Sequence, residues 1–457
     1  MVRLFHAYFP TRTLLLAALE AVVTLLGFIL ARILWLQSTD TEESYLKIVL
    51  VGCVLILCMY YYDLYESRIL ANVTAVLARL VQVLGTACVI LSIVYIAYPK
   101  LQMNQGVLLI GILSASIGLL SCRGVFLAII RSHRMALRTV LLGNSRLAQQ
   151  LAAEVAVRPD LGIRLDGYIA GSPAEVDCES KVELLGTVET LPQIVERQSI
   201  ECMIVALDKR DQLPMETLFA LKKRGVRIED GTDFYEHMTG KVLLESLNWN
   251  QLVFSPTYLP SAFTVFAKRA ISIVASAVAL VVLGPLMAAI AFIVEIDSKG
   301  PAIFRQQRIG KDGKLFTLFK FRSMRLGVDS DGIARPVQEK DERLTSFGGL
   351  LRKSRLDELP QLVNILLGDI DFVGPRPFVP CQEEEMASKI PFYSHRWDVR
   401  PGLTGWAQVN RGYCATIEDN AEKLSYDLYY IKNMSLGLDL LIWFKTVKTM
   451  ILGRGAR

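Results

Sequence analysis

Residues 270–296, AISIVASAVALVVLGPLMAAIAFIVEI, form one apolar run with Gly284 and Pro285 near its middle. The run is long enough to span a bilayer, but proline removes a helix hydrogen bond and disfavours helical geometry in the residue before it. Cations flank the run on both sides: Lys268, Arg269, Lys299, Arg305 and Arg308. Because cations mark the cytoplasmic face, the pattern predicts a hairpin that has a break or a sharp kink at Gly284-Pro285 and that enters and leaves the membrane on that face.

Four further apolar runs lie upstream, each near or above the ~20 residues that cross a bilayer as a helix. They occupy residues 13–36, 46–64, 73–98 and 106–130. Arginines stand outside the first, second and fourth runs, whereas the connection at 38–43 is acidic and that at 99–105 carries a single lysine. By the positive-inside rule, both ends of this four-helix unit are predicted to face the cytoplasm.

Three ionisable residues fall within these runs: Glu20, Arg32 and Arg79. Such groups are costly in a bilayer and often functional. Interhelical pairing or snorkelling is favoured over a transport role, because both arginines can reach an interface. A channel or transporter is the alternative, and four spans without broken-helix repeats support it poorly.

The composition indicates a membrane protein of several domains. The chain has 457 residues, of which 52% are hydrophobic, and a net charge of +5. Residues 297–356 alone hold 14 Lys and Arg against 7 Asp and Glu, a local excess that suits anionic lipid, phosphate or a nucleotide diphosphate. No recognition module for nucleic acid accompanies it. The eight cysteines, without a CxxC pair or a histidine at ligand spacing, indicate neither a disulfide framework nor a zinc site.

From Arg138 the pattern changes to a short apolar strand, a glycine turn and a helix, which is how a Rossmann-type unit begins. Strand-like runs at 165–169 and 203–207 continue the α/β pattern. Gly143 stands alone where the dinucleotide motif needs three glycines, so a structural or regulatory domain is favoured over nucleotide binding. An epimerase or dehydratase would also need a tyrosine and a lysine one helical turn apart, and we find no such pair here.

Asp357 and Glu358 are adjacent carboxylates that follow the basic segment RKSR at 352–355. A carboxylate can attack phosphorus, hold a magnesium ion or carry a proton, while arginine neutralises phosphate oxygens. Taken alone, the segment fits a charged, solvated surface equally well. The surrounding motifs decide between the two interpretations.

Upstream of the pair, two segments present cations in ordered settings. RQQRIGKDG at 305–313 places Gln306 and Arg308 beside glycine turns, where they can contact phosphate oxygens and sugar hydroxyls. FTLFKFRSM at 316–324 alternates like a strand, which places Lys320 and Arg322 on one face.

Two turn-rich loops follow downstream. Arg376 stands between two prolines that stiffen its loop, so its guanidinium is presented with less freedom to lose. Arg400 opens the second loop, RPGLTGWAQVN at 400–410. These cation-bearing segments on both sides favour an active site at the two carboxylates.

This series, in this order, resembles the bacterial polyprenyl-phosphate sugar-1-phosphate transferases, the monotopic phosphoglycosyl transferases that start exopolysaccharide and O-antigen assembly. The resemblance covers about residues 265–457 through the motifs GP/QxRxG, KFRSM, LDELP, GPRP and RPGLTGW. The four apolar runs and the degenerate Rossmann-like domain match the long form of the family, of the type that transfers glucose phosphate.

The resemblance implies a membrane protein of α and α/β type. Four transmembrane helices would occupy residues 1–135, a cytoplasmic Rossmann-like domain 136–240 and a connector 241–266. A re-entrant membrane hairpin at 270–296 would begin the small α/β catalytic domain at 267–457. The protein is expected to be multi-pass in the bacterial inner membrane, with its catalytic domain on the cytoplasmic face.

The resemblance also implies a two-step reaction. Asp357 would attack the β-phosphate of a UDP-sugar of glucose or galactose type, release UMP and hold the sugar phosphate covalently. Polyprenyl phosphate, expected to be undecaprenyl phosphate, would then displace it. Glu358 would hold Mg²⁺ together with Asp357, or handle a proton. The substrate-binding candidates are Arg352, Arg376, Lys320, Arg322, Gln306, Arg308 and Arg400.

Three departures from the family pattern stand out. An acid usually follows the Lys-Arg pair at the start of the hairpin, where this chain has Ala270, and the break is commonly Ser-Pro rather than Gly284-Pro285. Asp371 stands where members generally have serine. Residues 424–452 predict interfacial helices or a packed core helix with equal weight.

The expected partners are a UDP-sugar, undecaprenyl phosphate and membrane lipids, with no nucleic acid and with homo-oligomerisation left open. Two other classes compete with the transferase. One is a membrane-anchored nucleotide-sugar epimerase or dehydratase, and the other is a non-catalytic scaffold of a polysaccharide export complex.

Overall fold

The computed structural model describes residues 1–35, 42–66, 69, 73–132, 136–171, 182–207, 213–247, 260–325, 343–411 and 416–451. Most of the predicted acidic connection at 38–43 and about half of the connector at 241–266 lie outside these residues. The chain divides into two compact units, Met1–Val2 with Phe9–Phe234 and Arg3–Tyr8 with Tyr235–Arg457.

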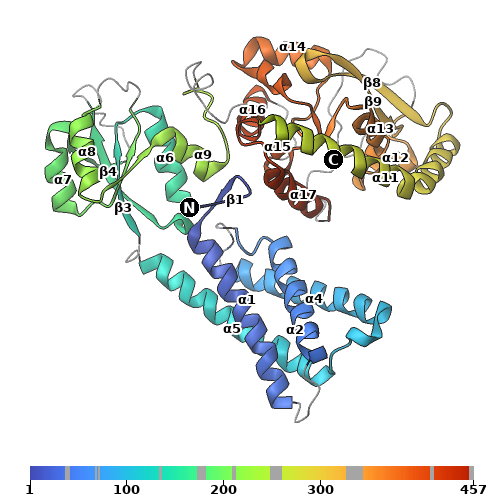
Figure 1. Cartoon of the computed structure of the whole chain (residues 1–457), viewed down its shortest axis with the longest axis horizontal. Helices are drawn as coiled ribbons and strands as arrows, with labels where there is room; N and C mark the ends of the chain where they lie inside the picture. Colours follow the sequence, from blue (N-terminus) through green and yellow to red (C-terminus); the bar gives the residue numbers. More distant parts are fainter. Residues whose placement is uncertain are drawn as a thin grey trace. The chain divides into compact units, whose positions relative to one another are not determined.

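The first unit begins with a bundle of apolar helices (Figure 1). Its helices are α1 (Thr11–Trp35), α2 (Glu42–Tyr61), α4 (Val73–Ala97) and α5 (Gln105–Ser132). The short strands β1 (Val2–Leu4) and β2 (Ala7–Phe9) precede them in the sequence, and most of their residues belong to the second unit. All four predicted runs are therefore helical. Among the described residues, α1, α4, α5 and the later α11 are long and apolar enough to cross a membrane, whereas the apolar part of α2, Tyr45–Tyr61, is shorter.

Charged side chains inside the bundle pair with one another. Arg123 Nε lies 2.6 Å from Glu20 Oε1, and both side chains are buried. Arg79 Nη1 lies 3.3 Å from Asp63 Oδ2, and the guanidinium of Arg32 lies over a tyrosine ring of α2. The prediction of interhelical pairing is thus confirmed for Glu20, and Arg79 pairs with a carboxylate in the turn that follows α2.

The rest of the first unit is a parallel five-stranded sheet with helices on both faces. Its strands are β3 (Leu137–Leu142), β4 (Ile163–Ala170), β5 (Leu184–Thr187), β6 (Cys202–Val205) and β7 (Arg227–Asp230), in the order β5-β4-β3-β6-β7. Helix α6 (Arg146–Val157) covers one face, and α7 (Leu191–Gln198) and α8 (Met215–Lys223) cover the other (Figure 1). This is the doubly wound order expected of a Rossmann-type domain.

The glycine turn of this domain brings two strand ends together. Gly143 has a φ of 105°, and a Cβ at this position would lie 2.7 Å from the Ala206 carbonyl oxygen. Ser145 Oγ donates a hydrogen bond to that same oxygen at 2.6 Å. The lone glycine therefore permits the turn after β3 to contact the end of β6, which fits the favoured structural role.

Helix α9 (Gly231–Thr239) begins in the first unit and ends in the second. The next long helix, α11 (Ala262–Asp297), contains the apolar run that predicts a hairpin. Helix α11 is continuous through Gly284 and Pro285. Of the predicted break or sharp kink, the break is therefore wrong at the level of secondary structure. A proline removes one backbone hydrogen bond, and the bonds on either side keep the segment helical, so Pro285 marks a place for a kink rather than a helix end.

Both ends of α11 bind the same small α/β body. Lys268 Nζ, near the start, donates to the Val373 carbonyl at 2.6 Å. Asp297 Oδ2, at the end, accepts from the Phe347 amide at 3.0 Å. Between these anchors the helix exposes large apolar side chains: Ile271, Val274, Val278, Val281, Val282, Leu286 and Phe292.

That body contains two small sheets and several helices. An antiparallel pair is formed by β8 (Ile303–Ile309) and β9 (Leu315–Phe321), and a parallel pair by β10 (Asp371–Val373) and β11 (Gly402–Thr404). The helices are α12 (Ser346–Lys353), α13 (Gln361–Leu367), α14 (Pro380–Lys389), α15 (Trp406–Asn410), α16 (Ile417–Lys432) and α17 (Leu436–Ile451). These elements position the loops that carry the candidate site.

Helix α17 combines the two alternatives predicted for the C-terminus. Leu438 and Ile442 are fully buried, so one face packs as a core helix does. Trp443, Phe444 and Val447 are exposed on the helix and leave an apolar surface of the kind that interfacial helices present.

Candidate active site

A tight turn after α12 presents the two carboxylates. Arg355 has a φ of 59°, the left-handed region that residues other than glycine rarely adopt. This conformation costs about 1–3 kcal/mol and often marks a functional site. It starts the short 3-10 helix Leu356–Glu358, which turns Asp357 inward until only 6% of the residue is exposed.

Glu358 is surrounded by cations. Its Oε1 lies 3.0 Å from Lys320 Nζ and 3.1 Å from Arg376 Nη2, and its Oε2 lies 3.7 Å from Arg355 Nη1. Burial alone would raise the pKa of Glu358, but Lys320, Arg376 and Arg355 outweigh it and hold the pKa well below its usual range. A proton carrier needs a pKa near the working pH. These contacts therefore indicate that Glu358 holds the cationic side chains around it and does not transfer a proton.

Asp357 has a different environment from its neighbour. Within the part of the chain that the structure describes, no hydrogen-bond donor or cation lies at bonding distance from its carboxylate. Burial, followed by the adjacent charge of Glu358, raises the pKa of Asp357 despite Lys320, Arg352 and Arg376 nearby. An ionised Asp357 would therefore keep its lone pairs available for attack on an electrophile.

Replacing Asp357 by Asn should raise the unfolding temperature at neutral pH. A raised pKa means that the folded state holds the proton more tightly than the unfolded state, so ionisation destabilises the fold as pH rises. The neutral amide removes that penalty. The gain should shrink as pH falls through the raised pKa, and it should vanish below the ordinary carboxyl range. Thermal unfolding of the detergent-solubilised protein at several pH values measures this gain. A lower unfolding temperature for the variant at neutral pH would contradict the raised pKa of Asp357.

Replacing Glu358 by Gln should have the opposite effect on stability. Its lowered pKa contributes stability above the ordinary pKa of a glutamate, and that contribution disappears as pH falls toward the folded-state pKa. At neutral pH the variant should therefore unfold at a lower temperature than the unmodified protein. The same unfolding series tests this, and equal unfolding temperatures across the neutral range would show that the three cations do not stabilise the fold through Glu358.

The structure brings five of the predicted residues together. Lys320 and Arg376 contact Glu358, and the charge of Arg352 lies close enough to Asp357 to lower its pKa. Arg352 Nε also donates to a serine hydroxyl, Ser323 Oγ, at 3.1 Å. Three cations beside two carboxylates leave the cluster net positive, which suits a diphosphate.

Gln306 and Arg308 bond to each other at the edge of this cluster. Arg308 Nη2 donates to Gln306 Oε1 at 2.6 Å, and Arg308 Nη1 donates to the Pro377 carbonyl at 3.1 Å. Partial burial, and then the nearby Arg376, lower the pKa of Arg308 to about 10. These contacts hold the loop that carries Arg376, and this role does not depend on a bound substrate.

Two predicted residues are directed elsewhere. Strand β9 ends at Phe321, and the next residue, Arg322, is buried with its guanidinium donating to the Val294 and Lys299 carbonyls, each at 3.2 Å. The expectation that Arg322 shares the site-facing side of Lys320 is therefore wrong. For Arg400, the structure places the backbone against Gly374, and no described contact joins its guanidinium to the carboxylates.

Asp371 belongs to the anchor of α11. It is 4% exposed, and its Oδ1 lies 3.8 Å from Arg269 Nη1. Arg269 also donates to the Ile365 carbonyl at 2.6 Å. Asp371, which departs from the family pattern, thus lies beside Arg269. The family usually has an acidic residue after that arginine, and this chain has Ala270 there.

A magnesium ion could be held here by few protein ligands. Mg²⁺ usually takes one or two carboxylates and completes its shell with water and substrate phosphates. No group of three or more His, Cys, Asp or Glu side chains forms a metal site among the described residues. Asp357, with no donor on its carboxylate, fits the pattern of one carboxylate plus diphosphate better than Glu358, whose oxygens already face cations.

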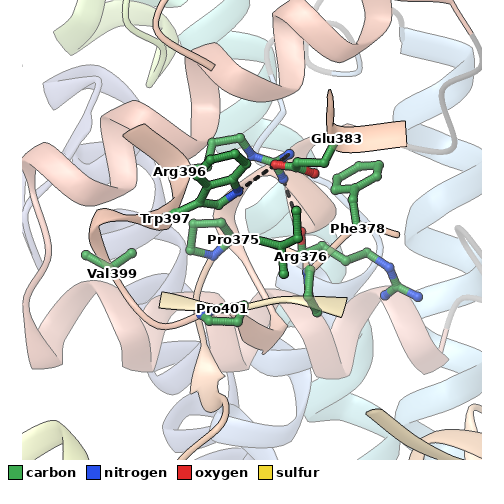
Figure 2. A pocket seen from close by; sticks show the side chains of 11 residues that line it. Pro375, Arg376, Phe378, Glu383, Arg396, Trp397, Val399 and Pro401 are labelled. Carbon is green, nitrogen blue, oxygen red and sulfur yellow. Dashed lines mark hydrogen bonds and ion pairs between the residues drawn. The ribbon is translucent and has the colours of Figure 1, made fainter. Parts of the chain in front are cut away.

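Sequence reasoning missed two arginines at the site. Arg355 supplies both the left-handed turn and a contact to Glu358, and Arg396 donates through Nη2 to the Arg376 carbonyl at 3.1 Å (Figure 2). The first directly precedes the carboxylate segment. The second lies in SHRWD at 394–398, just before the RPGLTGW loop, which is the signal that could have identified it.

Comparison with known proteins identifies two matching families. Residues 263–453 match the family described as bacterial sugar transferase, and residues 61–229 match the family described as CoA-binding domain. The first region contains the whole candidate site. The second ends within β7, so it includes most of the parallel sheet.

Three named relatives match between 42% and 71% of this chain. A UDP-N-acetylgalactosamine-undecaprenyl-phosphate N-acetylgalactosaminephosphotransferase of Aeromonas hydrophila is 44% identical over 49% of this chain and 52% of its own length. An undecaprenyl-phosphate glucose phosphotransferase of Komagataeibacter xylinus is 32% identical over 71% of this chain and 61% of its length. A UDP-glucose:undecaprenyl-phosphate glucose-1-phosphate transferase of Caulobacter vibrioides is 38% identical over 42% of this chain and 73% of its length. The chain thus spans between about half and three fifths of the first two relatives.

Proposed function

The chain belongs to the bacterial sugar transferase family, and from this premise we propose that it transfers a sugar 1-phosphate from a UDP-sugar to undecaprenyl phosphate. The names of the relatives share the undecaprenyl phosphate acceptor and differ in the sugar, which is N-acetylgalactosamine in one and glucose in others. The donor is therefore proposed as a UDP-hexose of a type still to be identified. The product would start polysaccharide assembly.

The observation that carries the proposal is the contrast between two adjacent carboxylates. Three cations neutralise Glu358, whereas the Asp357 carboxylate has no donor within bonding distance in the described residues. Asp357 is therefore proposed as the nucleophile. Its oxygen would form a bond to the β-phosphorus of the donor while the bond from that phosphorus to the bridging oxygen breaks, and UMP leaves with the electron pair.

The second step transfers the sugar phosphate from Asp357 to the lipid. A phosphate oxygen of the lipid would attack the same phosphorus, and Asp357 would leave as a carboxylate. Arg376, Lys320 and Arg352 would neutralise the phosphate oxygens in both steps, because phosphoryl transfer depends chiefly on positioning and charge stabilisation. Glu358 would keep Lys320 and Arg376 aimed at the diphosphate.

Mg²⁺, when bound, would neutralise charge on the diphosphate and orient it. Asp357 is the residue whose contacts best allow it to ligate that ion, because the oxygens of Glu358 already contact Lys320 and Arg376. The remaining ligands would be water and substrate oxygens.

The anchors of α11 support the proposal that the segment enters and leaves the membrane on one face. A straight helix of 36 residues would extend about 54 Å, beyond the thickness of the ~30 Å hydrocarbon layer. Lys268 near one end and Asp297 at the other nevertheless bind one small α/β body. We expect α11 to lie in one leaflet with a kink at Pro285, so that a soluble donor and a lipid acceptor meet at one interface.

We further propose that the catalytic body faces the cytoplasm at the bacterial inner membrane. The arginine bias around the upstream helices supports this orientation. The Rossmann-like domain would have a structural or regulatory role, in keeping with its single turn glycine.

The test incubates the purified protein with Mg²⁺, undecaprenyl phosphate and a panel of UDP-sugars, and measures UMP. We expect one or a few donors to release UMP continuously. Without the lipid, release should stop after about one equivalent per protein, because the intermediate cannot turn over. No release from any donor would refute the transferase, and NAD binding in its place would favour an epimerase or dehydratase.

A further inference from the structure

Four successive carbonyls of the loop at 375–378 are held by donors from other segments. The bonds run from the Gly402 amide to Pro375 O at 2.9 Å, from Arg396 Nη2 to Arg376 O at 3.1 Å, from Arg308 Nη1 to Pro377 O at 3.1 Å and from the Ile309 amide to Phe378 O at 3.3 Å. Arg376 itself stands between two prolines. Its backbone is therefore fixed on both sides, and the donor on its own carbonyl is a side chain.

That side chain, Arg396, is held by a buried set of partners. The residue is 4% exposed, and its Nε donates to Asp427 Oδ2 at 2.9 Å while Nη1 donates to Tyr393 Oη at 2.8 Å. Nη1 also lies 3.7 Å from Glu383 Oε1, which accepts from Trp397 Nε1 at 2.7 Å. Figure 2 shows Arg396 and Glu383 side by side, with the bond from Arg396 reaching toward Arg376. The fork of the guanidinium thus leaves one nitrogen, Nη2, for the loop.

The guanidinium of Arg376 depends on this backbone for its position. Its side chain is 40% exposed, so burial does not fix it, and its described bond to the site is the 3.1 Å contact with Glu358. A displaced backbone would move Nη2 of Arg376 out of reach of that carboxylate. Misplacement by about 1 Å can cost a reaction about 100-fold.

We infer that Arg396 is a positioning residue for the transfer: its bond to the Arg376 carbonyl holds the Arg376 guanidinium against Glu358. The inference rests on the proposed function, and it assigns Arg396 no contact with the substrate. Lysine cannot replace it, because a single ammonium cannot bond Asp427 and the Arg376 carbonyl in the geometry of a planar fork.

The experiment is a double-mutant cycle on UMP release with Arg396→Lys and Arg376→Ala. Arg396→Lys should lower kcat about 10- to 100-fold and change KM for the donor by less than about threefold, as expected when a transition-state contact is displaced. Combined with Arg376→Ala, it should cause no further loss, because its effect passes through a guanidinium that is already gone. Losses that multiply in the double variant, or an unaffected Arg396→Lys enzyme, would overturn the inference.

A matched control and a second variant separate positioning from folding. Arg411 also pairs with two carboxylates, Asp419 at 2.8 Å and Glu422 at 2.7 Å, and Arg411→Lys should keep kcat within about twofold. If Arg396→Lys fails to fold, Asp427→Asn keeps an acceptor for Arg396 and should lower kcat about three- to tenfold, again without further loss on Arg376→Ala.

Labelling of Arg376 by phenylglyoxal provides a readout that does not need activity. In the Arg396→Lys variant, Arg376 should be released from Glu358, and phenylglyoxal should modify Arg376 at least about threefold faster. Mass spectrometry of the peptide that contains Arg376 measures the rate. Unchanged labelling would overturn the inference. If the unmodified protein releases no UMP from any donor, the proposed function fails while this labelling still decides the role of Arg396.

Discussion

Asp357→Asn is expected to lower UMP release by about 10⁴-fold or more, since removal of a nucleophile costs this much in enzymes that form covalent intermediates. The amide keeps the shape of the side chain and removes the attacking oxygen charge. The surrounding cations Lys320, Arg352 and Arg376 stay in place, so donor binding should persist. Initial rates and donor affinity, measured on the same preparation, separate the two effects.

Asp369→Asn serves as the control for this substitution. Its carboxylate accepts from Asn364 Nδ2 at 3.0 Å, at the end of α13, and it has no described contact with the candidate site. This variant should retain activity within about threefold, because substitutions away from the site usually have small effects. Undiminished UMP release by Asp357→Asn would remove Asp357 from the mechanism.

Glu358→Gln is expected to lower kcat about 100- to 1000-fold without raising KM for the donor. The amide oxygen can still accept hydrogen bonds, but without the charge it attracts Lys320 and Arg376 far less strongly than the carboxylate oxygen that they now contact at 3.0 and 3.1 Å. The site also becomes more positive by one charge, so the diphosphate should bind at least as well in the ground state. The defect should therefore appear in the transition state.

A magnesium titration distinguishes this role from metal binding. If Glu358 holds the side chains of Lys320 and Arg376, as its contacts indicate, excess Mg²⁺ should leave the Glu358→Gln defect unchanged. If Glu358 is instead a principal ligand of the ion, high Mg²⁺ should restore a large part of the rate, and the positioning role would be wrong.

The sequence could predict the carboxylate pair and its nearest cations because their residue types and order carry the chemistry. Lys320 and Arg376 belong to short motifs that flank Asp357-Glu358, and both contact Glu358. The difference between the two carboxylates could not be predicted, because it depends on which side chains approach from β9 and from the proline loop. Arg322 was misassigned for the same reason, since its partners are carbonyls near the end of α11.

The fold shows a similar division. Long apolar runs and the strand–glycine–helix pattern predicted the helical bundle and the start of the parallel sheet. Strands β5 and β7 have four residues each and were not predicted, because short strands carry little periodic signal. A break at Pro285 was predicted beside a sharp kink because proline removes one hydrogen bond. The other hydrogen bonds of the helix keep α11 continuous.

The covalent intermediate is the central claim, and trapping it is the most direct test. The purified protein is incubated with an accepted UDP-sugar and Mg²⁺ without lipid, digested, and analysed by mass spectrometry. The account predicts a sugar phosphate on the peptide that contains Asp357, absent in Asp357→Asn and discharged when undecaprenyl phosphate is added. Transfer to the lipid with no such adduct, or an adduct on another residue, would contradict it.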